Sequence, residues 1–92
     1  MNYFSWSVEK NESLKRERGV SFEEIIFHIE RGDLLDILKH PNQERYPGQR
    51  IFVVKIGEYA YLVPVVESAG EIFLKTVIRR RRATETYLRR RE

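Results

Sequence analysis

The residues best suited to chemistry are seven arginines near the end of the chain. Four are consecutive, Arg79, Arg80, Arg81 and Arg82, and three more occupy positions 89–91. Guanidinium groups stay ionised, form paired hydrogen bonds with phosphate oxygens, and stabilise the charge that develops on a phosphodiester during cleavage. The cluster therefore favours RNA binding or RNA cleavage. The alternatives are a solvated basic tail or a nuclear-import-like patch.

Charge is distributed unevenly along the chain. Residues 79–92 carry seven arginines and two glutamates, which gives 7 − 2 = +5, and the other 17 − 7 = 10 basic and 14 − 2 = 12 acidic groups give 10 − 12 = −2 for residues 1–78. Positive charge confined to one segment is the pattern of a compact domain that presents one face to a polyanion. It predicts a nucleic acid or an acidic protein as the partner.

Aromatic side chains offer stacking surfaces for unpaired bases. Trp6 and Tyr46 are the best candidates, and Tyr87 lies among the arginines. Tyr59 and Tyr61 share one face of a predicted strand, so we interpret them as core or hairpin packing.

Other catalytic arrangements are absent from the sequence. Cysteine is missing, and His28 and His40 have no visible catalytic partner. There is no Ser/His/Asp set, glycine-rich phosphate loop or acidic metal cluster. We therefore expect no metal and no cofactor, and a reaction in which the 2′-hydroxyl of RNA attacks while the protein supplies orientation, cations and proton transfer.

The length of 92 residues predicts one domain, residues 1–92, with a single core. No apolar run is long enough for a membrane helix. Residues 1–10 lack the pattern of a signal peptide. These features predict a cytoplasmic protein without a membrane partner.

Two helices are predicted before the sheet. Ser7 caps the first, over residues 8–18, and Gly19 ends it. The second covers residues 22–31 and buries an apolar stripe. Its capping box is Ser21 and Glu24, its stripe is Phe22, Ile25, Ile26 and Ile29, and its stop is Gly32.

Strands are predicted over most of the remaining chain. The first is a short strand or staple over residues 2–6, and the second covers residues 33–40 and is followed by a polar loop. An antiparallel meander of three strands then covers residues 50–56, 59–66 and 71–78. Pro64 predicts a bulge, an early strand end or an unpaired side. Beyond residue 78 the pattern becomes that of a docked helix with a cationic face. The fold class is therefore α+β, with an N-terminal helical hairpin packed on a three- to four-stranded antiparallel sheet and a basic C-terminal helix.

Several segments together resemble a known family. They are Phe4-Ser5-Trp6, Lys10-Asn11, the run RGVSFEE (18–24) and the run IRRRRATETY (78–87). The chain is similar in their order and spacing to the BrnT-type toxins, in which segments such as FEWD, KHGISFEEA and IISARKAT occur. The similarity spans nearly the whole chain. It departs from the family where Arg18 replaces a frequent histidine, where Arg79-Arg80 replace small residues, and where Tyr87-Leu88 replace Glu-Arg.

The resemblance implies a RelE-like fold and a ribonuclease that arrests translation, with free or ribosome-bound RNA as substrate. It also implies a small antitoxin partner whose ribbon-helix-helix half binds promoter DNA, so that the toxin reaches DNA only through the antitoxin. The family's basic pair matches Arg81 and Arg82, which the resemblance makes the first choices for phosphate binding and transition-state stabilisation.

The resulting hypothesis is an endoribonuclease toxin in which a cleft beside the sheet gathers the basic residues. The predicted catalytic set is Arg18, Arg79, Arg81 and Arg82, and the predicted RNA-binding set is Trp6, Lys10, Lys75, Arg80 and Tyr87. Two alternatives are a non-catalytic RNA- or ribosome-binding module, which the lack of an obvious general base favours, and a basic partner-docking protein.

Overall fold

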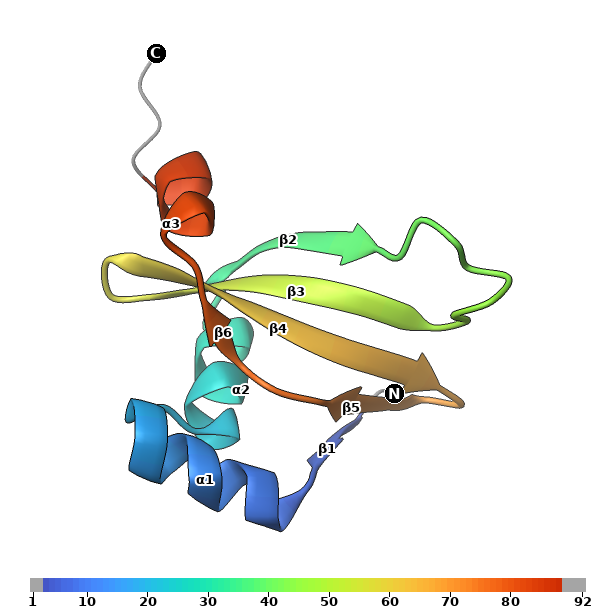
Figure 1. The fold of residues 1–92 in the computed structure, drawn as a ribbon, viewed down its shortest axis with the longest axis horizontal. Helices are drawn as coiled ribbons and strands as arrows, with labels where there is room; N and C mark the ends of the chain where they lie inside the picture. The colour runs from blue at the N-terminus through green and yellow to red at the C-terminus, as the bar shows by residue number, and fades with distance from the viewer. Residues whose placement is uncertain (1–2, 89–92) are drawn as a thin grey trace.

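The computed structural model describes residues 3–88, which form an α+β fold (Figure 1). Its elements in chain order are β1 (Tyr3–Trp6), α1 (Val8–Arg18), α2 (Phe22–Glu30), β2 (Leu34–Lys39), β3 (Gln49–Ile56), β4 (Tyr59–Ser68), β5 (Glu71–Leu74), β6 (Ile78–Arg79) and α3 (Arg81–Leu88). Among these residues, no helix has the length and apolar character needed to cross a membrane.

The strands form one mixed sheet in the order β1-β5-β4-β3-β2, and β6 pairs with β4 beside β5. All pairs are antiparallel except β1 with β5, which is parallel. The prediction of three or four antiparallel strands is therefore wrong in number and in the direction of the first strand. Parallel pairing joins Tyr3 to Glu71 across most of the chain, and no local sequence pattern signals so distant a contact.

The predicted strand over residues 71–78 is split into β5 and β6 at Pro64 of the neighbouring strand. The carbonyl oxygen of Pro64 accepts a hydrogen bond from the Lys75 amide (2.9 Å), so the missing N–H of Pro64 faces the same side. The gap between β5 and β6 falls where this donor is absent. Pro64 therefore has no register partner in β5 or β6, although its carbonyl is bonded on that side. The predicted early strand end is wrong, because β4 runs on to Ser68 in unbroken register with β3 as far as Val66.

The first two helices match their predicted bounds to within one residue. Ser7 caps α1, Gly19 ends it with φ 67°, and Ser21 and Glu24 form the capping box of α2. Asn11, 3% exposed, joins the two helices. Its Oδ1 accepts from the Phe22 amide and its Nδ2 donates to Glu23, both at 2.8 Å.

Helices α1 and α2 cover one face of the sheet, and α3 lies on the opposite face (Figure 1). Leu14, Phe22 and Ile25 pack with Val54 and Val63 in the larger apolar cluster between α1, α2 and the sheet. The smaller cluster lies under α3 and contains Val53, Ala60 and Ala83. Successive residues of a strand point to opposite faces, so β3 and β4 contribute side chains to both clusters.

The C-terminal helix is docked through polar contacts as well as apolar ones. The hydroxyl of Thr84, a residue that is 2% exposed, accepts from the Ala60 amide at 3.1 Å. The predicted helix begins at Arg81 rather than directly after Ile78, because Arg79 continues the chain as a strand beside β4. Arg81 and Arg82 are exposed, as the predicted cationic face requires, and residues 89–91 lie outside the described residues.

Candidate nucleic-acid interface

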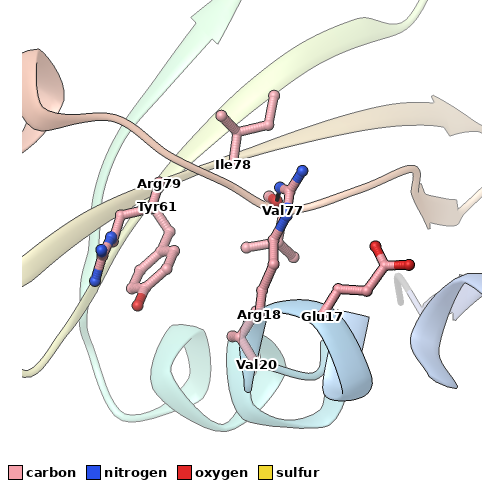
Figure 2. A pocket seen from close by; sticks show the side chains of 7 residues that line it. All are labelled: Glu17, Arg18, Val20, Tyr61, Val77, Ile78 and Arg79. Atoms are coloured by element: carbon pink, nitrogen blue, oxygen red, sulfur yellow. Dashed lines mark hydrogen bonds between the residues drawn. The ribbon is translucent and has the colours of Figure 1, made fainter. Parts of the chain in front are cut away.

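One hollow of the molecule lies where the end of α1 meets β6. It encloses about 440 Å³, which is within the range of small-molecule sites. Its lining residues come from three parts of the chain and are Glu17, Arg18, Val20, Tyr61, Val77, Ile78 and Arg79 (Figure 2). The structure thus brings Arg18 and Arg79 to one cleft beside the sheet.

Arg18 is held at the mouth of this hollow by the end of its helix. Gly19 takes a left-handed conformation that ends α1 immediately after Arg18. The Arg18 side chain then reaches the backbone at Val77 (Figure 2), and its Nη1 donates to the Val77 carbonyl oxygen at 2.7 Å. A guanidinium carries five N–H donors, so this bond fixes its position and leaves donors for an anion.

Arg79 and Tyr61 lie opposite each other on β6 and β4. Their Cα atoms are register partners, so their side chains share one face of the sheet and lie side by side in Figure 2. Tyr61 packs partly against the larger core cluster, whereas Arg79 is exposed. The site therefore combines an aromatic wall with two cations.

A second hollow of about 410 Å³ adjoins the first and shares Arg79 with it. Tyr59, Arg81 and Thr84 complete its lining. The Arg79 guanidinium carbon lies 4.5 Å from the centre of the Tyr59 ring, which is a cation–π contact. The side chains of Arg79 and Arg81 thus extend a basic surface from β6 onto α3.

Four predicted residues lie elsewhere or serve the fold. Trp6 packs against Phe22 with ring centres 5.8 Å apart, because β1 delivers it to the larger core cluster. Lys10 is half-buried in the first turn of α1, at the opposite end of that helix from Arg18. The exposed side chains of Lys75 and Arg80 do not line either hollow in the described part of the chain.

Tyr87 anchors α3 rather than standing free for a base. Its hydroxyl donates to Asp36 of β2 at 2.7 Å, and its ring packs on the smaller core cluster. The hydrogen bond to Asp36, with burial, raises the pKa of the Tyr87 phenol, so the donor stays protonated. These contacts give Tyr87 a structural role, and its RNA-binding role stays a prediction. Arg82 is exposed on the same helix but lines neither hollow described for residues 3–88.

The histidines and Tyr46 also lie away from both hollows. His28 Nδ1 is 2.8 Å from Asp33 Oδ2, and the hydrogen bond with His28 lowers the pKa of the Asp33 carboxyl. His40 and Tyr46 stack on each other, with ring centres 4.2 Å apart. Within residues 3–88, no three His, Cys, Asp or Glu side chains converge as metal ligands do.

Sequence reasoning missed Glu17, Tyr59 and Tyr61 as site residues. Glu17 precedes Arg18 in the last turn of α1 and is among the residues that line the first hollow. Tyr59 is 41% exposed and belongs to neither core cluster, so core packing, the first of its two predicted roles, is wrong. Its pairing with Ile56 beside the turn agrees with the second role, hairpin packing. The pairing of β6 with β4 puts both tyrosines beside Arg79, and no local pattern in the sequence predicts this pairing.

No protein-family model and no curated protein matches the chain.

Proposed function

We propose that this chain is the toxin of a type II toxin–antitoxin pair, with a RelE-like fold, and that it cleaves RNA in the cytoplasm and so inhibits translation. The observation that carries the proposal is the hollow in which Arg18 and Arg79 lie together with Glu17. Guanidiniums can stabilise the charge of the transition state and a carboxylate can accept a proton, which are two requirements of cleavage without a metal.

The chemistry assigns one role to each of these side chains. The 2′-hydroxyl of RNA attacks the adjacent phosphorus, a bond forms between phosphorus and O2′, and the bond to the 5′-oxygen breaks. Glu17 takes the hydroxyl proton, and the leaving oxygen takes a proton from solvent. Arg18 and Arg79 stabilise the charge that accumulates on the phosphoryl oxygens. The products are a 2′,3′-cyclic phosphate and a 5′-hydroxyl.

The second candidate function is an RNA- or ribosome-binding module that does not cleave. The exposed arginines beside the hollows support it equally, because phosphate contacts alone give salt-dependent affinity. Glu17→Gln separates the two functions, since it removes the base and keeps the shape of the side chain. If Glu17→Gln loses cleavage and still binds RNA, the ribonuclease function is supported. If the wild type binds RNA but does not cut it, the binding module is supported.

The antitoxin partner is best accommodated on the part of the sheet that α3 leaves open. An apolar row lies there across neighbouring strands, because its members are register partners or lie two residues apart on β4. It consists of Leu38, Ile51, Pro64, Val66 and Phe73. Leu38 is 39% and Phe73 is 37% exposed. Lys75, an exposed cation, lies next to Pro64 of this row, and α3 carries the exposed cations Arg81 and Arg82. An acidic amphipathic segment of the antitoxin complements this surface.

Co-expression with the neighbouring gene tests the docking surface. Phe73→Glu is expected to abolish co-purification of the encoded acidic protein. Phe27→Glu is the matched control, because Phe27 is 59% exposed on α2 and lies outside the apolar row. Equal loss with both variants, or with neither, contradicts the proposed surface.

The ribonuclease activity is tested by induced expression in a bacterial host, followed by primer-extension mapping of cellular RNA. Growth arrest and new cleavage sites are expected for the wild type and for Arg45→Ala, an exposed arginine that contacts Tyr46. Both effects should disappear with Arg79→Ala and with the pair Arg81→Ala and Arg82→Ala. Full toxicity of Arg79→Ala contradicts the site assignment, and absence of arrest and cleavage in the wild type contradicts the function.

A further inference from the structure

The two hollows each contain a tyrosine from the same strand. Tyr59 and Tyr61 are two residues apart on β4, so their rings lie on the same face of the sheet. Tyr61 lines the first hollow and Tyr59 lines the second. Arg79 lines both, so one cation lies at the junction of two aromatic surfaces.

The exposure of Tyr59 distinguishes it from a structural tyrosine. It is 41% exposed, follows the turn at Gly57 and Glu58, and is absent from both core clusters. The contact on its ring face is the Arg79 guanidinium at 4.5 Å. A guanidinium and a nucleobase use the same flat surface of an aromatic ring, so a base can take the place of Arg79 on Tyr59 if Arg79 turns to a phosphate.

The spacing of Tyr59 and Tyr61 favours RNA in which neighbouring bases are not stacked on each other. Two residues along a strand span about 6.6 Å, roughly twice the 3.4 Å between stacked nucleotides of one strand. Bases on Tyr59 and Tyr61 are therefore unstacked from each other. Aromatic surfaces of this kind read single-stranded RNA whose bases are splayed out, and a paired duplex cannot present them.

We infer that the site binds two successive nucleotides of unstacked, single-stranded RNA. One base lies in the hollow of Tyr61 and the next lies on Tyr59. Arg79 binds the phosphate between them, and Arg81, which lines the second hollow, binds the following phosphate. This inference rests on the proposed function and adds a second base subsite to it.

Fluorescence anisotropy with a labelled 2′-O-methyl RNA tetranucleotide tests the subsite, because this probe lacks the attacking hydroxyl. Tyr59→Leu is expected to weaken binding about tenfold, whereas Tyr59→Phe keeps the ring and stays within about twofold of the wild type. Tyr3→Leu is the matched control, since Tyr3 is 59% exposed on β1. A blunt-ended, fully paired 2′-O-methyl RNA duplex is expected to bind more weakly than the single strand.

The outcomes separate this inference from the function on which it rests. If the tetranucleotide binds but Tyr59→Leu has no effect, or if duplex binds as tightly as single strand, the second subsite is wrong and the RNA-binding function stands. If the wild type binds no RNA, both are wrong. Thermal unfolding of Tyr59→Leu shows whether a weaker signal comes from lost folding, and Tyr59→Phe provides the aromatic variant that keeps the packing.

Discussion

The Arg18 guanidinium donates a hydrogen bond to the carbonyl oxygen of Val77 at 2.7 Å, joining residues 59 positions apart. This bond ties the end of α1 to the segment between β5 and β6. It orients a cation in the hollow and positions the strand that carries Arg79. The arrangement of the site therefore depends on a helix end and a strand edge that are remote in sequence.

Arg18→Met is expected to lower the free energy of unfolding by about 1–2 kcal/mol, because it removes a charged hydrogen bond and leaves most of the apolar stem. Denaturant unfolding measures the change. Arg16→Met is the control, because Arg16 is also exposed and lies in the same helix. It should leave the stability nearly unchanged, as surface substitutions away from specific contacts usually do. Equal stability of the two variants would show that the Val77 contact contributes nothing.

Asn11 should be essential for joining α1 to α2. Asn11→Asp replaces the donor to Glu23 with an acceptor and sets two carboxylates against each other, so we expect a loss of about 1–3 kcal/mol at pH 7. Adding Glu23→Gln restores a donor and should recover much of this loss. Urea unfolding of the two single variants and the double variant measures the coupling, and strictly additive effects would contradict the proposed contact.

Thr84 is expected to hold α3 against the sheet through its hydroxyl. Thr84→Val keeps the shape and leaves the buried Ala60 amide without its acceptor, which costs about 1–3 kcal/mol. Thr84→Ser retains the acceptor and should be milder. Hydrogen exchange at Ala60 is the direct measurement, and unchanged protection in Thr84→Val would exclude this role.

Acid should destabilise the fold partly through Asp33. Its pKa in the folded state lies below the ordinary value of 3.8, chiefly because of the hydrogen bond with His28. The stabilisation is therefore present above the ordinary pKa and is lost as the pH falls through the folded pKa. Asp33→Asn should flatten the dependence of the unfolding midpoint on pH in this acidic range. An unchanged pH profile in this variant would contradict the assignment.

Two adjacent isoleucines of α2, Ile25 and Ile26, differ in burial although the sequence pattern treats them alike. Ile25 is fully buried and Ile26 only partly, although both lie on the predicted apolar stripe. Ile25→Ala should cost about 2–5 kcal/mol through lost burial and a cavity, and Ile26→Ala should cost less. Thermal or urea unfolding gives the order, and a larger effect at Ile26 would reverse it.

The helices were predictable because their signals are local. Ser7, Gly19 and the capping box of Ser21 with Glu24 act within one turn of chain, and each is found in its predicted role. The strand runs of β3 and β4 and the turn at Gly57 were predictable for the same reason, since alternation and turn residues determine them at short range. The division of the third run into β5 and β6 was not predictable in this way. The chemistry of the arginines also follows from composition alone.

The tertiary structure decided which of these residues meet. Pairing of β6 with β4 brought Arg79 beside Tyr61, and the end of α1 brought Arg18 and Glu17 to the same hollow. It also assigned Trp6 to packing with Phe22 and Tyr87 to a hydrogen bond with Asp36. Such contacts depend on which strand edges remain unpaired and which faces are covered once the chain has collapsed. The sequence thus determined the residue types available for chemistry and the local elements that carry them, while long-range strand pairing and burial selected the members of the site.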